Sequence, residues 1–169
     1  MADYFFDSSA LVKSYIAEAG TDWVRTILDD PQHRIAISAL AEVEVTSALT
    51  RRFNEGDLTQ VELDQACDEL SQDCAVYFLV EVTRQILEAA VGNARNYYLR
   101  AYDAVQLASA VAVRTALLAT QSNVVDFTLV SADLALTTQR TEKAYKSRIR
   151  ILIKPTLDYR ITSPGSLPF

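Results

Sequence analysis

The chain has 169 residues, half of them hydrophobic and 22% charged, which predicts a single globular domain. With 22 acidic and 16 basic residues the net charge is −6, which argues against nucleic-acid binding through bulk positive charge. Four isolated glycines, one histidine and two cysteines seven residues apart exclude a glycine-rich phosphate loop, a multi-histidine zinc site and a CxxC pair.

Short apolar runs alternate with helical patterns along the chain. We expect strands at residues 4–6, 34–38, 75–80, 127–131 and 150–153. We expect helices at residues 8–17, 21–28, 39–53, from 59 onward, 83–97, 99–118 and 132–145. This alternation predicts a three-layer α/β/α sandwich around a parallel sheet of about five strands.

The chain is predicted to form one domain over residues 1–154. Residues 155–169 hold three of the four prolines and should form a tail that packs on this domain or extends from it. The amino-terminal residues lack the basic and apolar regions of a signal peptide, and no apolar run is long enough to cross a membrane. We therefore expect a cytoplasmic protein that makes no membrane contact.

Two aspartates are expected at the carboxyl edge of this sheet, where ligands collect in open α/β folds. Asp7 directly follows the first predicted strand, and Asp133 follows the fourth. Asp126 precedes the fourth strand and should lie at the opposite edge.

A third acid, Asp103, stands early in the alanine-rich helix, with Leu107 and Ala110 at helical spacing on the same face. An inward-facing carboxylate is costly unless it is paired or binds a cation. Arg100, three residues earlier, is the nearby candidate partner. Stabilisation by the helix dipole, pairing with Arg100 and cation binding all remain open from spacing.

Glu42 and Glu44 share one predicted helix and point to different faces. Glu42 has Val45 and Leu49 at core spacing, so periodicity does not favour Glu44, and spacing alone does not choose between them. Carboxylates gathered without histidine or cysteine would form an all-oxygen site suited to Mg²⁺ or Mn²⁺. The alternative is a set of unrelated surface and capping acids.

Four segments in chain order resemble a PIN-domain ribonuclease and, more narrowly, the VapC-like toxin of a VapBC toxin–antitoxin pair. The segments are FFDSSALVKSY, VEVTSAL, LRAYDAVQLASA and LVSAD, and the resemblance runs from about Tyr4 to Ile153. It implies metal-binding and catalytic roles for Asp7, Glu44, Asp103 and Asp133, with Ser131 and Arg100 in support. It also implies RNA cleavage with Mg²⁺ or Mn²⁺, a homodimer, and silencing by a cognate antitoxin.

RNA contacts are expected from local groups of basic and aromatic residues. A basic stretch near the carboxyl end and the pair Arg51 and Arg52 are candidates for phosphate binding. The basic stretch comprises Arg140, Lys143, Lys146, Arg148, Arg150 and Lys154. Tyr97, Tyr98 and Tyr102 are candidates for stacking on unpaired bases, although such spacing is also typical of core residues.

Three competing classes can be weighed on the residues. A receiver-type signalling domain needs paired acids after the first strand and an acceptor aspartate after the third, and a haloacid-dehalogenase-type phosphatase needs a DxD motif. Asp7 is instead followed by Ser8 and Ser9, which disfavours both classes. A non-catalytic PIN-fold module for RNA binding or assembly keeps the same acids and stays the main alternative.

Overall fold

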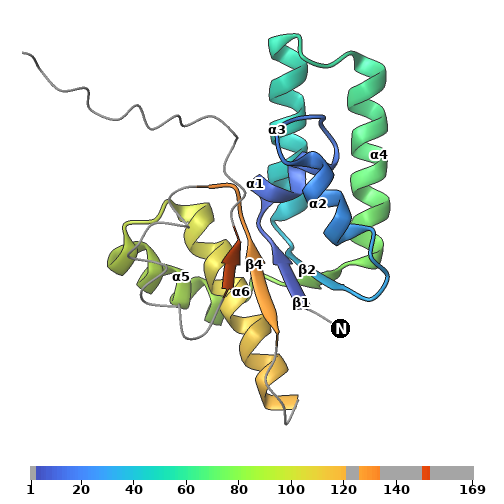
Figure 1. The fold of residues 1–169 in the computed structure, drawn as a ribbon. Coiled ribbons are helices and arrows are strands. Elements are labelled where there is room, and N and C mark those ends of the chain that lie inside the picture. The colour runs from blue at the N-terminus through green and yellow to red at the C-terminus, as the bar shows by residue number, and fades with distance from the viewer. Residues whose placement is uncertain (1–2, 121–125, 134–149, 153–169) are drawn as a thin grey trace, which may run out of the picture.

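The protein is described by a computed structural model that defines residues 3–120, 126–133 and 150–152 (Figure 1). The five strands are β1 (Asp3–Phe6), β2 (Arg34–Ser38), β3 (Phe78–Val80), β4 (Phe127–Val130) and β5 (Arg150–Leu152). The helices are α1 (Ser8–Leu11), α2 (Thr21–Leu28), α3 (Ala41–Glu55), α4 (Gln60–Val76), α5 (Arg84–Tyr97) and α6 (Ala101–Thr120), with a 3₁₀ helix η1 (Val12–Ser14).

The strands form one sheet in the order β3-β2-β1-β4-β5, and every neighbouring pair is parallel. Phe6 at the end of β1 lies in register between Ile37 of β2 and Val130 of β4. The chain therefore leaves β1 toward β2 on one side and later returns to β4 on the other. This change of direction makes the carboxyl ends of β1 and β4 the switch point of the sheet, the place where open α/β sheets bind ligands.

Helices cover both faces of the sheet, as expected for the α/β/α sandwich (Figure 1). Phe5 points into a core formed with α5 and α6, where Leu107 is fully buried. The next residue, Phe6, points into the core on the other face, where Val45 and Leu49 of α3 are fully buried. This alternation fixes the register, because a shift of one residue would exchange the two faces.

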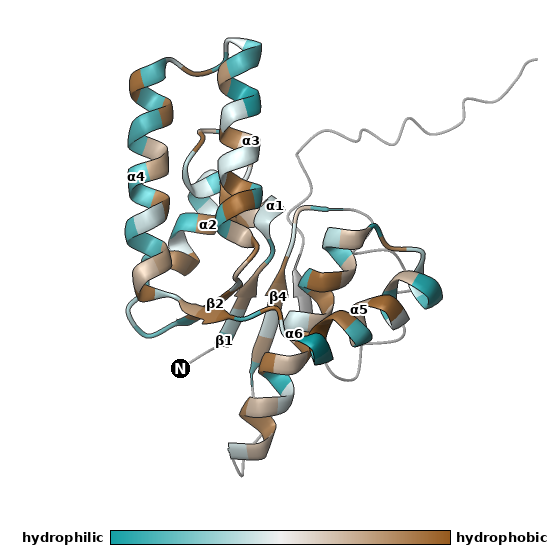
Figure 2. Ribbon diagram, turned by 180° about the vertical axis from the view of Figure 1, so that it is seen from behind, coloured by the Kyte–Doolittle hydropathy of each residue, from teal (hydrophilic) through white to brown (hydrophobic). Residues whose placement is uncertain are grey.

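Figure 2 shows hydrophobic strands enclosed by helices, and the α3–α4 hairpin is hydrophilic on much of its surface. Thr59 begins α4 with the predicted capping box, in which its side chain accepts from the Glu62 backbone and the Glu62 side chain accepts from the Thr59 backbone. Within the part of the chain that the structure describes, no helix is long and apolar enough to cross a membrane.

Two predicted elements are shorter in the structure. The first helix was expected to reach residue 17, but α1 ends at Leu11 and η1 at Ser14. Ser14 Oγ donates to the Leu11 carbonyl and Arg25 donates to the Ser14 carbonyl, so these carbonyls are satisfied without a longer helix. The third strand begins at Phe78 rather than Ala75, because α4 continues through Val76.

Three sequence predictions fall on residues outside the described ranges. They are the helix at 132–145 beyond Asp133, the last residue of the strand at 150–153, and the tail at 155–169. The prediction that Asp126 lies at the opposite sheet edge is confirmed, because its carbonyl accepts the backbone N–H of Asp3 at the start of β1 at 3.0 Å.

Candidate active site

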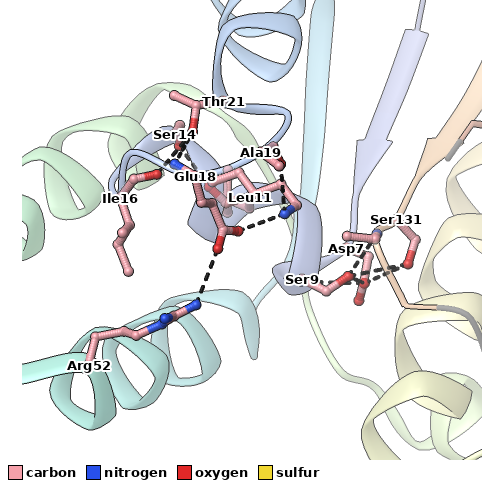
Figure 3. A network of polar contacts seen from close by, with 12 residues as sticks. Asp7, Ser9, Leu11, Ser14, Ile16, Glu18, Ala19, Thr21, Arg52 and Ser131 are labelled. Atoms are coloured by element: carbon pink, nitrogen blue, oxygen red, sulfur yellow. Dashed lines mark hydrogen bonds and ion pairs between the residues drawn. The ribbon is translucent and has the colours of Figure 1, made fainter. Parts of the chain in front are cut away.

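Asp7 lies at this switch point, directly after β1. Its backbone N–H donates to the Val130 carbonyl of β4 at 3.0 Å, which fixes the residue between the two strands. Among the described residues, all hydrogen bonds to its side chain fall on Oδ2, from Ser9 N, Ser9 Oγ and Ser131 Oγ. Figure 3 shows the three side chains converging at the end of β1. Their common target, Oδ2, leaves Oδ1 as the oxygen available to a ligand.

Glu44 in the first turn of α3 lies at the same edge of the sheet, in hydrogen-bond contact with the residue that follows Asp7. Its Oε2 accepts from Ser8 Oγ at 2.6 Å and from Gln106 Nε2 of α6. Glu42 is exposed and lies toward α4, where burial raises the pKa of the Cys74 thiol and the charge of Glu42 adds to the rise. The structure therefore places Glu44, and not Glu42, beside the other acids.

Asp103 comes from the first turn of α6 and is half-buried. Its Oδ2 is buried and has no hydrogen-bond partner among the described residues. Burial raises the pKa of Asp103 and the charge of Arg100 only partly opposes that rise, since Arg100 is exposed and, in the described ranges, no ion pair joins the two side chains. The pairing with Arg100 that the sequence left open therefore does not satisfy this carboxylate.

Ser131, the residue after β4, links Asp7 to the fourth acid. Its Oγ donates to Asp7 Oδ2 at 2.9 Å and accepts the backbone N–H of Asp133 at 3.1 Å. Ser9 Oγ accepts the backbone N–H of Ala132 at 3.0 Å. The two serines thus hold the chain segment after β4 against the beginning of α1.

The acids influence one another electrostatically. Burial raises the pKa of Asp7 to about 6, the charges of Glu44 and Asp103 add to the rise, and hydrogen bonds from Ser9 and Ser131 oppose it. Burial also raises the pKa of Asp103, with further contributions from Asp133 and Glu44. Each of the four acids predicted from the sequence therefore interacts electrostatically with at least one of the others.

This cluster has the donor chemistry of a site for a hard divalent cation. Its ligands would all be oxygen atoms, and Asp103 Oδ2 is a buried acceptor that lacks a donor. In the described ranges, no three Asp, Glu, His or Cys side chains are close enough together to enclose an ion as they stand. The carboxylates are thus near enough to interact electrostatically, but in the described part of the chain they do not surround an ion. The chemistry of their oxygen atoms fits a divalent cation.

Figure 3 also shows a second polar network, to one side of the group formed by Asp7, Ser9 and Ser131. Glu18 accepts from Lys13 Nζ at 2.6 Å and from Arg52 Nη2 at 3.2 Å, and Arg52 also pairs with Asp57 at 3.0 Å. Arg52 is therefore already engaged by acids of its own chain. The basic stretch from Arg140 to Lys154 has no described side chains.

Three further residues hold the carboxylates of the site by hydrogen bonds, and the sequence analysis did not assign them to it. Ser8 and Gln106 hold Glu44, and Ser9 holds Asp7. The two serines could have been suspected from their place beside Asp7. Gln106 could also have been suspected, because it is a polar residue among the apolar positions of α6, where it is only 1% exposed.

The PIN domain family model matches residues 4–133, which include all four acids. The chain belongs to the PIN-domain family. The resemblance seen in the sequence is thereby confirmed, and PIN-domain membership accounts for the parallel sheet with acids at its carboxyl edge.

Two curated PIN relatives are Ribonuclease VapC45 from Mycobacterium tuberculosis (strain CDC 1551 / Oshkosh) and Ribonuclease VapC49 from Mycobacterium tuberculosis (strain ATCC 25618 / H37Rv). Each is 37% identical over 109 residues, which span 64% of this chain and 75% of the relative. This identity supports the narrower likeness to VapC proteins.

Solved structures share the PIN fold at low identity. VapBC2 from Rickettsia felis, bound to a DNA fragment from its promoter, aligns with a TM-score of 0.54 at 10% identity over 90% of this chain and 99% of that one. A toxin–antitoxin complex from Klebsiella pneumoniae gives 0.53 at 15% identity, over 88% and 95% of the two chains. PAE2754 from Pyrobaculum aerophilum gives 0.52 at 21% identity, over 86% and 94%.

Proposed function

We propose that this PIN-domain protein is a Mg²⁺- or Mn²⁺-dependent endoribonuclease and the toxin of a toxin–antitoxin pair. The observation that carries the proposal is a set of acids at the switch point of the sheet in which Asp7 is buried and Asp103 Oδ2 has no donor among the described residues. Likeness to two proteins named Ribonuclease VapC supports RNA as the substrate.

In this proposal Asp7, Glu44, Asp103 and Asp133 hold one or two divalent cations. A bound cation of this kind supplies an activated water and stabilises the charge that develops on the leaving oxygen of a phosphodiester. Ser9 and Ser131 fix the Asp7 carboxylate by binding Oδ2, and Ser8 and Gln106 do the same for Glu44. The chain thus orients its carboxylates before substrate arrives, which avoids reorganisation during the reaction.

Exposed aromatic residues beside Asp103 support binding of unpaired bases. Tyr98 and Tyr102 are 75% and 60% exposed, whereas Tyr97 packs partly buried against the core. Among the tyrosines whose side chains the structure describes, these two are the exposed ones, and both flank the start of α6. We assign them to base stacking and Arg100 to phosphate contact.

The partners of this proposal are RNA, a cognate antitoxin and a second copy of the chain. The Klebsiella pneumoniae and Rickettsia felis structures are of toxin–antitoxin complexes, which supports the antitoxin. The homodimer rests on the sequence resemblance and is tested by the mass of the purified protein in solution. The cytoplasmic location expected from the sequence stays a prediction.

RNA cleavage by the partner-free protein tests the proposal, with Mn²⁺ or Mg²⁺, with a chelator, and with Asp103→Asn. The helix α3 offers a matched pair, because Glu44→Gln changes a carboxylate of the cluster and Glu42→Gln an exposed one two residues away. We expect chelation, Asp103→Asn and Glu44→Gln to abolish cleavage, and Glu42→Gln to retain it.

Cleavage that survives both the chelator and Asp103→Asn would overturn the metal–carboxylate mechanism. The competing function is a PIN module that keeps the same acids and binds RNA without cutting it. Metal binding measured by calorimetry, together with RNA binding but no cleavage of any RNA tested, would support that alternative.

A further inference from the structure

Glu44 is held by two side chains that are not themselves acids. Ser8 Oγ donates to Glu44 Oε2 at 2.6 Å, and Gln106 Nε2 donates both to the same oxygen and, at 2.9 Å, to Ser8 Oγ. The three groups form a closed triangle of hydrogen bonds between α1, α3 and α6. Both protein donors meet Oε2, so Oε1 is the carboxylate oxygen that remains available to a ligand.

The orientation of the Gln106 amide follows from this triangle. Its Nε2 lies within hydrogen-bond distance of both Ser8 Oγ and Glu44 Oε2. Turning the amide over would place its carbonyl oxygen against the Glu44 carboxylate, where two acceptors would repel each other. Gln106 is thus a donor toward Glu44, and its side chain is 1% exposed.

This arrangement leaves an unfavourable atom behind. Gln106 Oε1 is buried without a hydrogen-bond partner among the described residues, which costs about 1–3 kcal/mol for such a group. An apolar side chain of the same size would avoid this penalty, as Val105 and Leu107 do on either side. A glutamine at this position is therefore not explained by packing.

The position of Gln106 on α6 links two of the acids. Asp103 stands three residues earlier on the same helix, and the charge of Glu44 raises its pKa. Gln106, which donates to Glu44, and Asp103, which Glu44 repels, are therefore held on one helix. A fixed amide donor at this point offsets part of the repulsion and sets the spacing between the two carboxylates.

We propose that Gln106 is a positioning residue that holds Glu44, with Ser8 as an intermediate, so that Oε1 and Asp103 face a divalent cation together. This inference rests on the proposed metal site. It assigns to Gln106 no contact with the cation or with RNA.

The test compares Mn²⁺ binding by calorimetry in the metal-free full-length protein and in Gln106→Met, which keeps the side-chain size and removes both donors. We expect the Mn²⁺ dissociation constant to rise roughly 10- to 100-fold, the range typical of changes that act behind a metal ligand. Ser8→Ala should weaken binding in the same direction, and the double variant should be less than additive because the two residues act as a unit.

Ser109→Ala is the matched control, because Ser109 is buried on the same helix and its Oγ also has no partner in the described part of the chain. It should leave Mn²⁺ affinity unchanged. Thermal unfolding in chelator, together with Mn²⁺ affinity, separates the two roles of Gln106. Positioning predicts weaker Mn²⁺ binding by the folded protein whatever the change in unfolding temperature, because the substitution removes a donor to Glu44 together with the unpartnered carbonyl.

A purely structural role predicts a lower unfolding temperature with unchanged Mn²⁺ affinity, and that result would overturn the inference. Failure of the wild-type protein to bind Mn²⁺ would instead overturn the proposed metal site, so the two failures are distinguishable.

Discussion

Two aspartates at opposite ends of β1 have opposite surroundings. Asp3 at the amino end is 6% exposed and accepts two hydrogen bonds from Arg34, at 2.5 Å to Oδ1 and 2.8 Å to Oδ2. Asp7, directly beyond the carboxyl end, is 4% exposed and receives only serine donors and a backbone N–H among the described residues. Among the described residues, one buried carboxylate is thus paired with a cationic side chain, and the other is not.

This difference distinguishes a structural acid from a functional one. The Arg34 guanidinium binds both oxygens of Asp3, so that edge of the sheet needs no further cation. At the other edge, burial raises the pKa of Asp7 to about 6, and two neighbouring acids add to the rise. A carboxyl group with a pKa raised in this way is typical of a functional site, where a bound cation can stabilise its charged form. The apolar pocket of about 270 Å³ beside Asp3 and Arg34 carries no comparable group of acids.

The largest expected effect is on RNA cleavage, compared between variants at the two ends of β1. Asp7→Asn removes a proposed metal ligand. It should therefore lower RNA cleavage by more than the roughly 10- to 100-fold loss that is typical when a residue behind a metal ligand is changed. Asp3→Asn should leave the cleavage rate per folded molecule unchanged. Rates measured at saturating Mn²⁺, normalised to the folded fraction, check the contrast, and equal losses for the two variants would contradict it.

The second prediction concerns stability against pH in chelator. The pKa of Asp7 is about 6 in the folded protein against 3.8 in the unfolded chain, so the folded state binds more protons between these values and loses stability as pH rises through them. Asp7→Asn should therefore stabilise the metal-free protein by about 1–3 kcal/mol above pH 7 and by nothing below pH 4.

Urea unfolding at pH 4, 6 and 8 measures this gain. Saturating Mn²⁺ provides the control, because a cation bound only to the folded wild type should cancel or reverse the advantage of the variant. A gain of equal size at all three pH values would show that Asp7 is not the titrating group.

The third prediction is a loss of stability at the amino edge. Arg34→Ala leaves Asp3 buried without its partner and should destabilise the protein by about 1–2 kcal/mol, less than for a fully buried pair because Arg34 is half-exposed. Adding Asp3→Asn should recover part of this loss, since no charge then remains buried. Chemical denaturation of the two variants gives both values. A double variant less stable than Arg34→Ala would argue against a pairing role.

The fold was largely predictable from the sequence because short apolar strands alternate with helices whose apolar spacing is regular. The places of Asp7 and Asp133 followed from the strand ends, and the capping box at Thr59 from a local motif. The extent of the third strand did not follow, because Ala75 and Val76 suit a strand and a helix equally and α4 continues through them.

The choice between Glu42 and Glu44 shows where sequence reasoning ends. Ala41, Val45 and Leu49 form the buried stripe of α3, and the two glutamates flank it on opposite sides. Helical periodicity places Glu42 nearer to that stripe, but it does not indicate which flank meets the other acids. The choice depends on Ser8 and Gln106, which come from distant parts of the chain.

The smallest expected effect comes from Ser131→Ala. The hydrogen bond from Ser131 lowers the pKa of Asp7, so its removal should raise that pKa further without removing the carboxylate. Protons then compete more strongly with a cation, so Mn²⁺ binding should weaken by less than about tenfold near pH 6 and by less again at pH 8, where Asp7 is ionised in both proteins. Calorimetry at the two pH values checks this, with Ser109→Ala as the control. A loss of affinity equal at both pH values would mean that Ser131 acts on the position of Asp133, whose backbone N–H it accepts, and not on the charge of Asp7.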